Sequence, residues 1–524
     1  MGFKFQINQD TKFKRNEPYL SIAKKNDPVI YYSEHEPQKY IDGEKYTQNI
    51  NEDTVNSETD LLNKKFTRDD SVILDFGNHY VGRFLIDIKK IGAPMDAPLT
   101  LKIQFAENYD ELSYKPEEYD GWLSKSWIPI EVLHIDSLPS RLKMSRRYSF
   151  RYAKITVIDT SPKWKIQFEN PLVISQSAIS EKDYSDALIH NDDPMLEKIE
   201  NVSIKTLSEC MQSVFEDGTK RDQRLWLGDL HLQALANYST FNKNNLVKKC
   251  LYLFAGLTTS DGKICANIFT NKEVIPDDTF LFDYSLFFVS TLKDYFERTS
   301  DAYTAGELYN TSKRQVDLAL NLVDQYGKLS LPSDWPAFID WNDDFNKETA
   351  AQAVLVYVLK DFISLSKELE MDISDDYEYM LRLLINYSQR KLFNESNNQF
   401  ISGKNNEINI YSQIWMILAN VFDKEKSKSI MESTIKDFFP IKNIATPYMY
   451  HFVAETLLSV GMKEEAISLI KGYWGSMIEK GADTFWEAYK PDDPSYSPYG
   501  SPLVNSYCHA WSCTPVYLIK KYNL

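Results

Sequence analysis

Three aspartates, Asp217, Asp222 and Asp229, stand close together in a segment that also carries Arg221 and Trp226. Carboxylates in such a group can accept hydrogen bonds from sugar hydroxyls, and burial or a neighbouring charge can keep one of them protonated. An indole beside them can border the sugar ring. The alternative is a solvated loop in which the charges form surface ion pairs and Asp229 caps the following helix. The spacing alone does not decide between these interpretations.

A second candidate cluster, Trp486 with Glu487, lies in the segment GADTFWEAY, just before a stretch rich in Pro and Tyr. Hydrolysis of a glycoside with inversion needs one carboxylic acid and one carboxylate base on opposite faces of the ring, roughly 6.5 to 9.5 Å apart. The two clusters could supply one group each. A loop glutamate that faces water is the alternative here.

The composition narrows the class of ligand. The chain has 524 residues and a formal net charge of −16, which repels nucleic acid and acidic membranes, so neither is expected as a partner. Aromatic residues make up 14 % of the chain, and such side chains stack on flat, amphipathic ligands such as sugars. The sequence contains no HExxH motif, no Gly-rich phosphate loop and no GxSxG elbow, so we expect no metal and no cofactor.

The five cysteines show no CxxC spacing, and we expect reduced thiols. The N-terminus is polar and charged without an apolar h-region, and no run of 18 uncharged apolar residues occurs in the chain. We therefore expect a soluble, cytoplasmic protein.

Two hydrophobic periodicities divide the chain near residue 190. Short apolar or alternating runs from about residue 70 to 175 predict the strands of a β-sandwich. Beyond residue 190 a 3.6-residue period predicts twelve helices, which fit the six hairpins of an (α/α)6 barrel. They lie near 194–211, 229–242, 244–256, 279–298, 302–326, 347–370, 375–393, 409–422, 424–437, 446–460, 463–480 and 503–521.

We expect two domains from this pattern, an N-terminal β-sandwich over residues 1–185 and a barrel over residues 190–524. Residues 1–70 have a mixed pattern, in which YLSIAKK and VIYYSE are candidate strands and YTQNINEDTVNSETDLLNKK reads as irregular chain. The loops between the predicted helices differ greatly in length, and a barrel that places its long loops on one rim places its binding site there.

The segment DGTKRDQRLWLGD resembles the signature loop of the α-L-rhamnosidases of glycoside hydrolase family 78, in which a Trp precedes a Gly-Asp pair. Further motifs similar to that family follow in the right order. They are LDFGNHYVGR (74–83), FDYSLFF (282–288), FIDWN (338–342), TPYMYHFVAE (446–455), DTFWE (483–487) and CHAWS (508–512). The ordered set covers about residues 70 to 524 and is far more specific than any single motif.

The resemblance implies a β-sandwich followed by an (α/α)6 barrel, and an inverting, exo-acting α-L-rhamnosidase, which we expect to act on small glycosides. It places the general acid at Asp222 and the general base at Glu487. The expected substrate-binding residues are Asp217, Arg221, Trp226, Asp229, Asp283, Trp341, Trp486 and His509. The chain ends directly after the last predicted helix, so we expect it to lack the C-terminal β-domain usual in this family. A second copy of the chain could cover the barrel surface that this leaves exposed, as a homodimer.

The acid position has two alignments. The family's acid is usually Glu, and one alignment places that column on Gln223, which cannot donate a proton as a catalytic acid. We prefer Asp222, because its spacing to Asp217 and Asp229 then needs no gap against the shorter form of the motif.

Other interpretations stay open at this point. The chain could be another six-hairpin glycoside hydrolase or a polysaccharide lyase, which would abstract a proton from a uronic acid with His or Tyr. It could also be a degenerate barrel that binds rhamnosides without cleaving them, since Asp222 is one methylene shorter than the usual acid. Asp283 with Tyr284 could form a hydrogen-bonded core pair, and Trp341 could serve ordinary packing.

Overall fold

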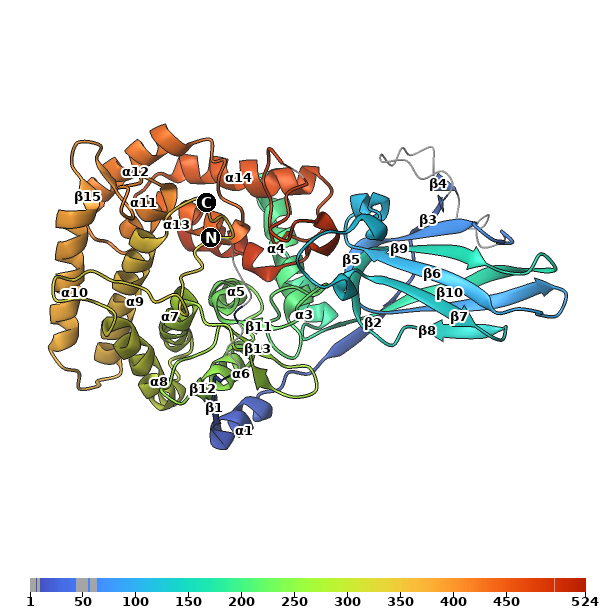
Figure 1. Ribbon diagram of the computed structural model, residues 1–524, viewed down its shortest axis with the longest axis horizontal. Helices are drawn as coiled ribbons and strands as arrows, with labels where there is room; N and C mark the ends of the chain where they lie inside the picture. Colours follow the sequence, from blue (N-terminus) through green and yellow to red (C-terminus); the bar gives the residue numbers. More distant parts are fainter. Residues whose placement is uncertain (1–5, 7–9, 44–54, 57–63, 494) are drawn as a thin grey trace.

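The computed structural model describes residues 6, 10–43, 55–56, 64–493 and 495–524. Figure 1 shows a domain of long strands on one side and a larger helical domain on the other. This confirms the predicted order of a β-sandwich followed by a helical barrel. Most of the stretch predicted as irregular chain, YTQNINEDTVNSETDLLNKK, lies outside the described residues.

The sheet domain is built around one long strand, β5 (Ser71–Gly92), which passes from one layer of the sandwich to the other. The N-terminal part of β5 pairs with β3 and β9, and its C-terminal part pairs with β10 and β8. The other strands are β2 (Tyr31–His35), β3 (Lys39–Asp42), β4 (Val55–Asn56), β6 (Leu99–Ala106), β7 (Ile130–Ile135), β8 (Ser140–Lys143), β9 (Tyr148–Asp159) and β10 (Trp164–Ser177). The inward side chains form one aromatic and aliphatic core that includes Phe76, Phe84 and Phe150.

The motif LDFGNHYVGR lies within β5, and the strand continues through an irregularity between Asp75 and Tyr80. Gly77 has a φ of 73°, a conformation that side chains disfavour, and its N–H donates to the Asp75 carboxylate over 2.8 Å. This local bend leaves His79 fully buried between the two domains.

Twelve α-helices form the helical domain within the described residues, as the 3.6-residue period predicted. They are α4 (Pro194–Cys210), α5 (Leu227–Ser239), α6 (Asn244–Ala255), α7 (Phe282–Thr299), α8 (Ala302–Leu320), α9 (Glu348–Glu368), α10 (Asp376–Tyr387), α11 (Ile410–Leu418), α12 (Lys424–Phe438), α13 (Pro447–Ser459), α14 (Lys463–Glu479) and α15 (Pro515–Tyr522). The helices α5, α7, α9, α11, α13 and α15 pack in a closed ring, and α15 returns to α5. The remaining six surround this ring, which is the arrangement of an (α/α)6 barrel.

The inner helices are apolar on most of their surface because both faces are covered. In α13, for example, eleven of thirteen residues are buried. Among the described helices, only α9 is long and apolar enough to cross a membrane, and 78% of its most apolar window is buried inside the protein, as in a core helix. The loops that precede the inner helices include 211–226, 256–281, 321–347 and 480–514, and they meet at one rim.

The first described segment packs against the barrel. The strand β1 (Phe13–Arg15) pairs with β12 (Leu257–Thr259), and α1 (Glu17–Lys25) packs on α6. The interpretation of YLSIAKK as a strand is therefore wrong. The Asn16 side chain caps the helix and Pro18 stands in its first turn, a combination that starts helices. The strand β1 and the helix α1 thus contact the helical domain, although they lie within the residues 1–185 expected for the N-terminal domain, and those domain bounds stay a prediction.

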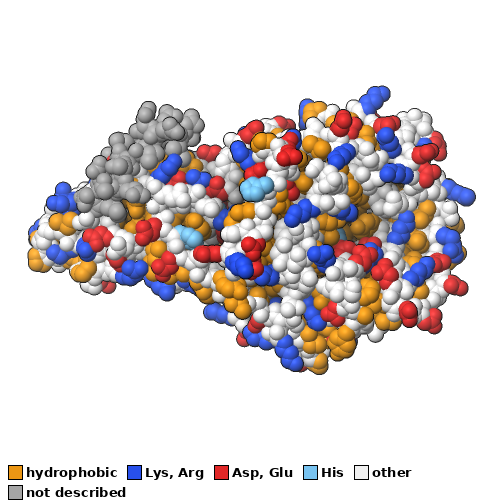
Figure 2. All heavy atoms as spheres, turned by 180° about the vertical axis from the view of Figure 1, so that it is seen from behind, with side chains coloured by type: hydrophobic (Ala, Val, Ile, Leu, Met, Phe, Trp, Pro, Cys, Tyr) orange, Lys and Arg blue, Asp and Glu red, His pale blue; other side chains and the backbone are white. Residues whose placement is uncertain are grey.

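The last predicted helix, 503–521, is also shorter than expected. The helix α15 begins at Pro515, and the preceding residues form two short turns, η7 (Pro502–Val504) and η8 (Ala510–Ser512). Pro515 lies inside the predicted range and cannot continue a helical hydrogen-bond pattern, but it suits the first turn of a helix, so α15 begins there. Residues 505–509, between the two turns, are buried. Figure 2 shows acidic and basic side chains interspersed over the face that it presents.

Candidate active site

The loop before α5 carries the three aspartates of the first cluster. Asp217 is buried, its side chain accepts from the backbone N–H of Arg224 over 3.0 Å, and its carbonyl accepts from Ala510 N over 2.9 Å. Asp222 and Gln223 both have positive φ values, 64° and 53°. Two successive left-handed residues are sterically costly for side chains other than Gly and Asn, so the surrounding contacts must hold this turn in place.

Arg221 joins the two acidic clusters. Its Nη1 lies 3.0 Å from Asp222 Oδ2, and its Nη2 lies 2.6 Å from Glu487 Oε2. Its Nε donates to the carbonyl of Val504 over 3.0 Å, and the guanidinium carbon lies 4.2 Å from the centre of the Tyr499 ring. A planar guanidinium with fixed donor directions therefore sets the positions of both carboxyl groups.

Glu487 lies in the loop before α15, and both of its carboxylate oxygens are bound. Arg221 binds one oxygen, and the Tyr499 hydroxyl donates to the other. The backbone is also held, because Glu487 N donates to Ser506 O over 3.0 Å and Trp511 Nε1 donates to Glu487 O over 3.0 Å. The side chain is buried and has a single orientation imposed by these partners.

The third part of the site lies at the N-terminal end of α5. His509 Nδ1 lies 3.7 Å from Asp229 Oδ1, and His509 Nε2 lies 3.9 Å from Asp217 Oδ2. The Tyr284 hydroxyl donates to Asp229 Oδ2 over 3.4 Å. Burial, together with the positive charge of Arg221, lowers the pKa of His509 well below its ordinary value, so its ring is neutral.

Several buried polar atoms around this region have no hydrogen-bond partner among the described residues. They are Arg224 Nε, Trp226 Nε1, Asp229 Oδ1, Tyr448 Oη and His509 Nδ1. Buried polar groups in native proteins are nearly always paired, so donors and acceptors left free at one place indicate a ligand rich in hydroxyl groups.

The aspartates differ in their protonation. Burial and then the charges of Asp222 and Asp229 raise the pKa of Asp217 well above its ordinary value. Burial and then the charge of Glu487 raise the pKa of Asp229 in the same way. Burial also acts on Asp222, but the charges of Arg221 and Arg224 outweigh it and lower its pKa. Burial and charge therefore favour protonation at Asp217 and Asp229 over protonation at Asp222.

The structure brings together six of the predicted site residues, which are Asp217, Arg221, Asp222, Asp229, Glu487 and His509. Two predicted indoles lie at its edge. Trp226 meets the Tyr284 ring edge-on at 6.1 Å, and Trp341 meets the Tyr499 ring edge-on at 5.6 Å.

The two remaining predicted residues make other contacts. Asp283 accepts the backbone N–H groups of Phe338 and Ile339, both over 2.9 Å, so its two oxygens hold the loop before α9. Trp486 is buried edge-on against Tyr489 and Tyr507, within the helical core. These contacts give both residues a structural role, and their contact with substrate stays a prediction.

Tyr499 is the main residue of the site that the sequence did not single out. It lies in the Pro- and Tyr-rich segment after Glu487, where one Tyr among several carries no distinguishing spacing. The sequence also did not single out Arg224 as a site residue, although it lies in the same loop as Asp222. Its Nη2 lies 3.8 Å from Asp222 Oδ1 and its Nη1 lies 3.6 Å from Asp277 Oδ2. Arg224 therefore places a second positive charge, in addition to that of Arg221, beside Asp222.

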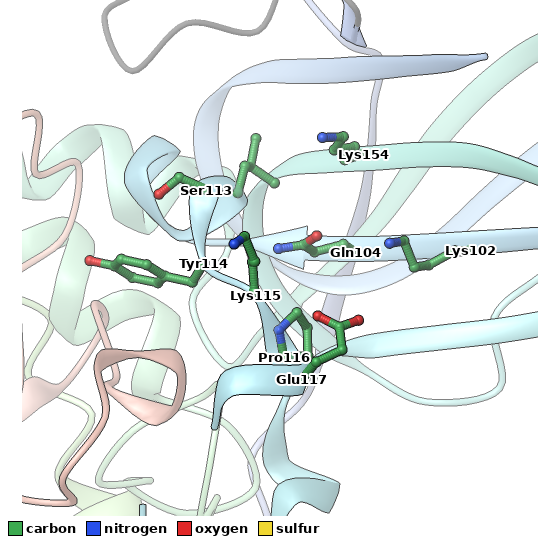
Figure 3. Close-up of a pocket in the computed structure, with 9 residues that line it drawn as sticks. Lys102, Gln104, Ser113, Tyr114, Lys115, Pro116, Glu117 and Lys154 are labelled. Atoms are coloured by element: carbon green, nitrogen blue, oxygen red, sulfur yellow. The ribbon is translucent and has the colours of Figure 1, made fainter. Parts of the chain in front are cut away.

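Two cavities in the described part of the chain differ in their distance from the site, and neither is lined by Asp222 or Glu487. The larger one, about 1040 Å³, adjoins the site at Phe338 and Trp341 and extends along the loops before α9 and α11. The smaller one, about 440 Å³, lies on the sandwich around Lys102 and Lys154 (Figure 3). The volume of a cavity therefore does not identify the active site in this protein. Among the described residues, no group of three His, Cys, Asp or Glu side chains could hold a metal ion.

A barrel of six helical hairpins, a preceding β-sandwich and a buried pair of carboxyl groups at the barrel rim together define a six-hairpin glycoside hydrolase. The comparisons with known proteins specify the family. Residues 185–522 match the family model of the bacterial alpha-L-rhamnosidase 6 hairpin glycosidase domain, and residues 38–175 match that of the glycosyl hydrolase family 78 alpha-rhamnosidase N-terminal domain. The chain belongs to the α-L-rhamnosidases of glycoside hydrolase family 78.

Solved structures agree with this assignment. A rhamnosidase from Klebsiella oxytoca with rhamnose bound is 41% identical, with a TM-score of 0.91 over 98% of this chain and 100% of the other. A family 78 rhamnosidase of Bacillus sp. GL1 is 20% identical, with a TM-score of 0.72 over 86% of this chain and 46% of the other. A Streptomyces avermitilis α-L-rhamnosidase complexed with L-rhamnose is 15% identical, with a TM-score of 0.65 over 94% and 44%. No sequence among the curated proteins matches.

Proposed function

We propose that this α-L-rhamnosidase removes terminal α-L-rhamnosyl residues from small glycosides with inversion of the anomeric configuration. Asp222 is the general acid that protonates the leaving oxygen, and Glu487 is the general base that activates water on the opposite face of the sugar. The observation that supports this most is the Arg221 guanidinium, which binds both carboxyl groups at its two ends.

The bridge between the two carboxyl groups is long enough for inversion. Retaining enzymes hold their carboxyl groups about 5 to 5.5 Å apart, whereas inverting enzymes leave roughly 6.5 to 9.5 Å for a water molecule. A guanidinium and an ion pair at each end, of 3.0 Å and 2.6 Å, lie between Asp222 and Glu487. When extended, a bridge of this length allows a separation in the wider range.

Glu487 suits the role of base because its partners hold its carboxyl group in one orientation. Arg221 and the Tyr499 hydroxyl each donate to one of its oxygens. The remaining lone pairs can accept a proton from a water molecule placed between the carboxylate and the sugar.

Asp222 must gain a proton before it can act as an acid, because Arg221 and Arg224 lower its pKa in the unliganded site. A sugar that enters between these groups excludes water and places a glycosidic oxygen beside Asp222. Its hydroxyls can also accept from the two arginines, which weakens their hold on the carboxylate. Both effects raise the pKa of Asp222 toward the value that a general acid needs.

Exo action is supported by how enclosed the sugar-binding groups are. Asp217, Asp229 and His509 each expose 4 % or less of their surface. A site as enclosed as this would hold one terminal ring, with the leaving group outside. The adjoining cavity at Trp341 has room for that leaving group, and the aromatic rings of Phe338, Tyr448 and Trp511 offer an apolar patch for the C6 methyl of rhamnose.

We also propose a cytoplasmic location. All five cysteines are buried and free, and the Sγ atoms of Cys210 and Cys508 lie 3.9 Å apart without forming a disulfide. Such thiols suit a reducing compartment. Small imported glycosides are the matching substrate class, and a homodimer stays a prediction.

The test is hydrolysis of an aryl α-L-rhamnoside followed by NMR of the sugar released first. We expect β-rhamnose as the initial product, which then mutarotates. The α anomer as first product would refute inversion while leaving rhamnosidase activity in place. Binding of rhamnose by calorimetry without any product from aryl or sugar rhamnosides would instead identify a binding protein.

A further inference from the structure

The two segments that carry Asp222 and Glu487 meet at one buried lysine, Lys220, and this lysine is held by the β-sandwich. Lys220 Nζ donates to the carbonyl of Asn505 over 2.8 Å and forms an ion pair with Glu111. The lysine side chain is 1% exposed. A charge buried this completely needs fixed partners, so its position is strongly determined.

Glu111 belongs to a short turn, η3 (Tyr109–Ser113), that follows strand β6. Its Oε2 accepts the backbone N–H groups of Glu107 and Asn108 over 2.7 and 3.0 Å, and its Oε1 pairs with Lys220. The side chain of Gln104 on β6 donates to the Glu111 carbonyl over 3.1 Å. Figure 3 shows Gln104 beside the segment that continues from this turn through Ser113 and Tyr114. The turn is thereby anchored to the sheet.

Glu107, at the end of the same strand, contacts both catalytic segments. Its Oε2 accepts from Tyr507 N over 2.6 Å and lies 3.9 Å from Lys220 Nζ. Its Oε1 accepts from the Ser149 hydroxyl over 2.7 Å, and Ser149 shares a second hydrogen bond of 2.7 Å with Thr219. One sandwich carboxylate therefore reaches the first segment through Thr219 and Lys220 and the second segment through Tyr507.

The next residue after Lys220 is Arg221, and the pair binds two successive carbonyls. Lys220 binds Asn505 O, and Arg221 Nε binds Val504 O over 3.0 Å. The position of Lys220 thus sets the position of the Arg221 guanidinium, on which Asp222 and Glu487 both depend.

Burying this cluster of charged side chains between the two domains costs desolvation free energy. Glu107, Glu111, Lys220 and His79 are all buried, and the His79 pKa is about 9 because, although burial lowers it, nearby Cys508 and Glu107 raise it. Buried ion pairs cost desolvation energy that well-packed apolar side chains would avoid, so adhesion alone does not require them. Directional hydrogen bonds do provide a defined geometry, which catalysis requires to within about 1 Å.

We propose that Glu107 and Glu111 of the β-sandwich are positioning residues of the active site, which hold Lys220 and the segment 505–507 and so set the separation of Asp222 and Glu487. This proposal rests on the assignment of those two residues as acid and base. It makes the sandwich a working part of the catalytic apparatus rather than an accessory domain.

The test compares Glu111→Gln with the parent protein on a rhamnosyl disaccharide and on a nitrophenyl rhamnoside. We expect kcat on the disaccharide to fall about tenfold to a hundredfold, because a misplaced acid and base lose alignment. KM should change less than about twofold, since Asp217, Asp229 and His509 keep their own partners. The loss on the nitrophenyl substrate should be smaller, because its leaving group needs little help from the acid.

Glu455→Gln is the matched control. Glu455 on α13 is also a carboxylate with a lysine partner, Lys521 Nζ at 2.8 Å, although its side chain is 14% exposed, and it touches neither catalytic segment. We expect both variants to lower Tm, with kcat within about twofold of the parent only for Glu455→Gln. If Glu111→Gln fails to fold, Ser149→Ala serves instead, because it removes the hydrogen bond to Thr219 without removing a charge.

The outcomes are distinct. A selective loss of kcat on the disaccharide in Glu111→Gln or Ser149→Ala supports the positioning role. Kinetics equal to those of Glu455→Gln at equal loss of Tm would overturn it and leave the proposed function untouched. A parent protein inactive on both substrates would overturn the proposed function and, with it, any role in positioning.

Discussion

Replacement of Asp222 by Asn tests the proposed general acid most directly. Asn tolerates the left-handed backbone that Asp222 adopts at a φ of 64°, so the turn should keep its shape. Asn Oδ1 can still accept from Arg221, which at present lies 3.0 Å from Asp222. Arg221 also keeps Glu487, and Arg224 keeps Asp277 at 3.6 Å. The variant should therefore fold, with a stability loss of at most about 1 to 3 kcal/mol.

The loss of activity should depend on the leaving group. A sugar or alkyl alcohol needs its oxygen protonated in the transition state, and general acid catalysis is worth about 10² to 10⁴ in rate, or roughly 3 to 5 kcal/mol. A nitrophenolate leaves with little help. We therefore expect Asp222→Asn to lose about a hundredfold or more on a rhamnosyl disaccharide and about tenfold or less on a nitrophenyl rhamnoside.

The pH dependence gives a second readout. A general acid must be protonated, so the rate of the parent should fall as pH rises through the acid's pKa in the substrate complex. Steady-state kinetics between about pH 4 and 9 should show that this alkaline limb is flattened in Asp222→Asn.

Gln223→Ala is the control, because it removes only the hydrogen bond from Gln223 Nε2 to Thr219 O, of 2.9 Å. It should show neither the leaving-group selectivity nor the altered pH profile. Equal losses on both substrates for Asp222→Asn would refute the assignment and leave this residue as a sugar-binding group.

Three further predictions follow from the same geometry. Glu487→Gln should keep the fold and rhamnose binding but lower kcat by about a hundredfold or more, because an amide cannot take a proton from water; unchanged turnover would remove Glu487 from the mechanism. Trp341→Ala should raise KM for a rhamnosyl disaccharide more than for methyl rhamnoside, since its ring lines the cavity beside the site; equal changes would place the leaving group elsewhere. His79, whose folded pKa is about 9 against an ordinary 6.5, should contribute stability that is complete below about pH 6.5 and is lost as pH rises through about 9. In His79→Gln, thermal unfolding should lose that part of the pH dependence, and an unchanged pH profile would show that His79 does not carry the charge.

The sequence by itself determined the order and kind of the elements. Helical periodicity placed the twelve barrel helices, because each buries a continuous apolar face that must repeat every 3.6 residues. The alternation of apolar and polar residues predicted the main strands, because successive side chains of a strand point to opposite faces of the sheet. The patterns failed at residues 19–25, where the local signals of a cap and Pro18 favour a helix, and at residues 503–514, where loop geometry replaces a helix.

The acidic motifs were also visible in the sequence, because the catalytic side chains stand close together in two short segments. The contacts between these segments were not visible in the sequence. Arg221 and Glu487 are 266 residues apart, Lys220 and Glu111 are 109 apart, and Lys220 and Asn505 are 285 apart. No local spacing encodes such contacts, since they arise only when the sandwich, the first loop and the last loop meet.

The tertiary structure alone decided the protonation of the site. The three aspartates of this loop have the same side chain but different pKa values. Burial and neighbouring carboxylates raise the pKa of Asp217 and Asp229, while two arginines lower that of Asp222. It also revealed Tyr499, which its contacts with Glu487 and Arg221 distinguish from the other tyrosines of its segment. Charge–charge interactions depend on distance and on exclusion of water, and both are properties of the folded chain.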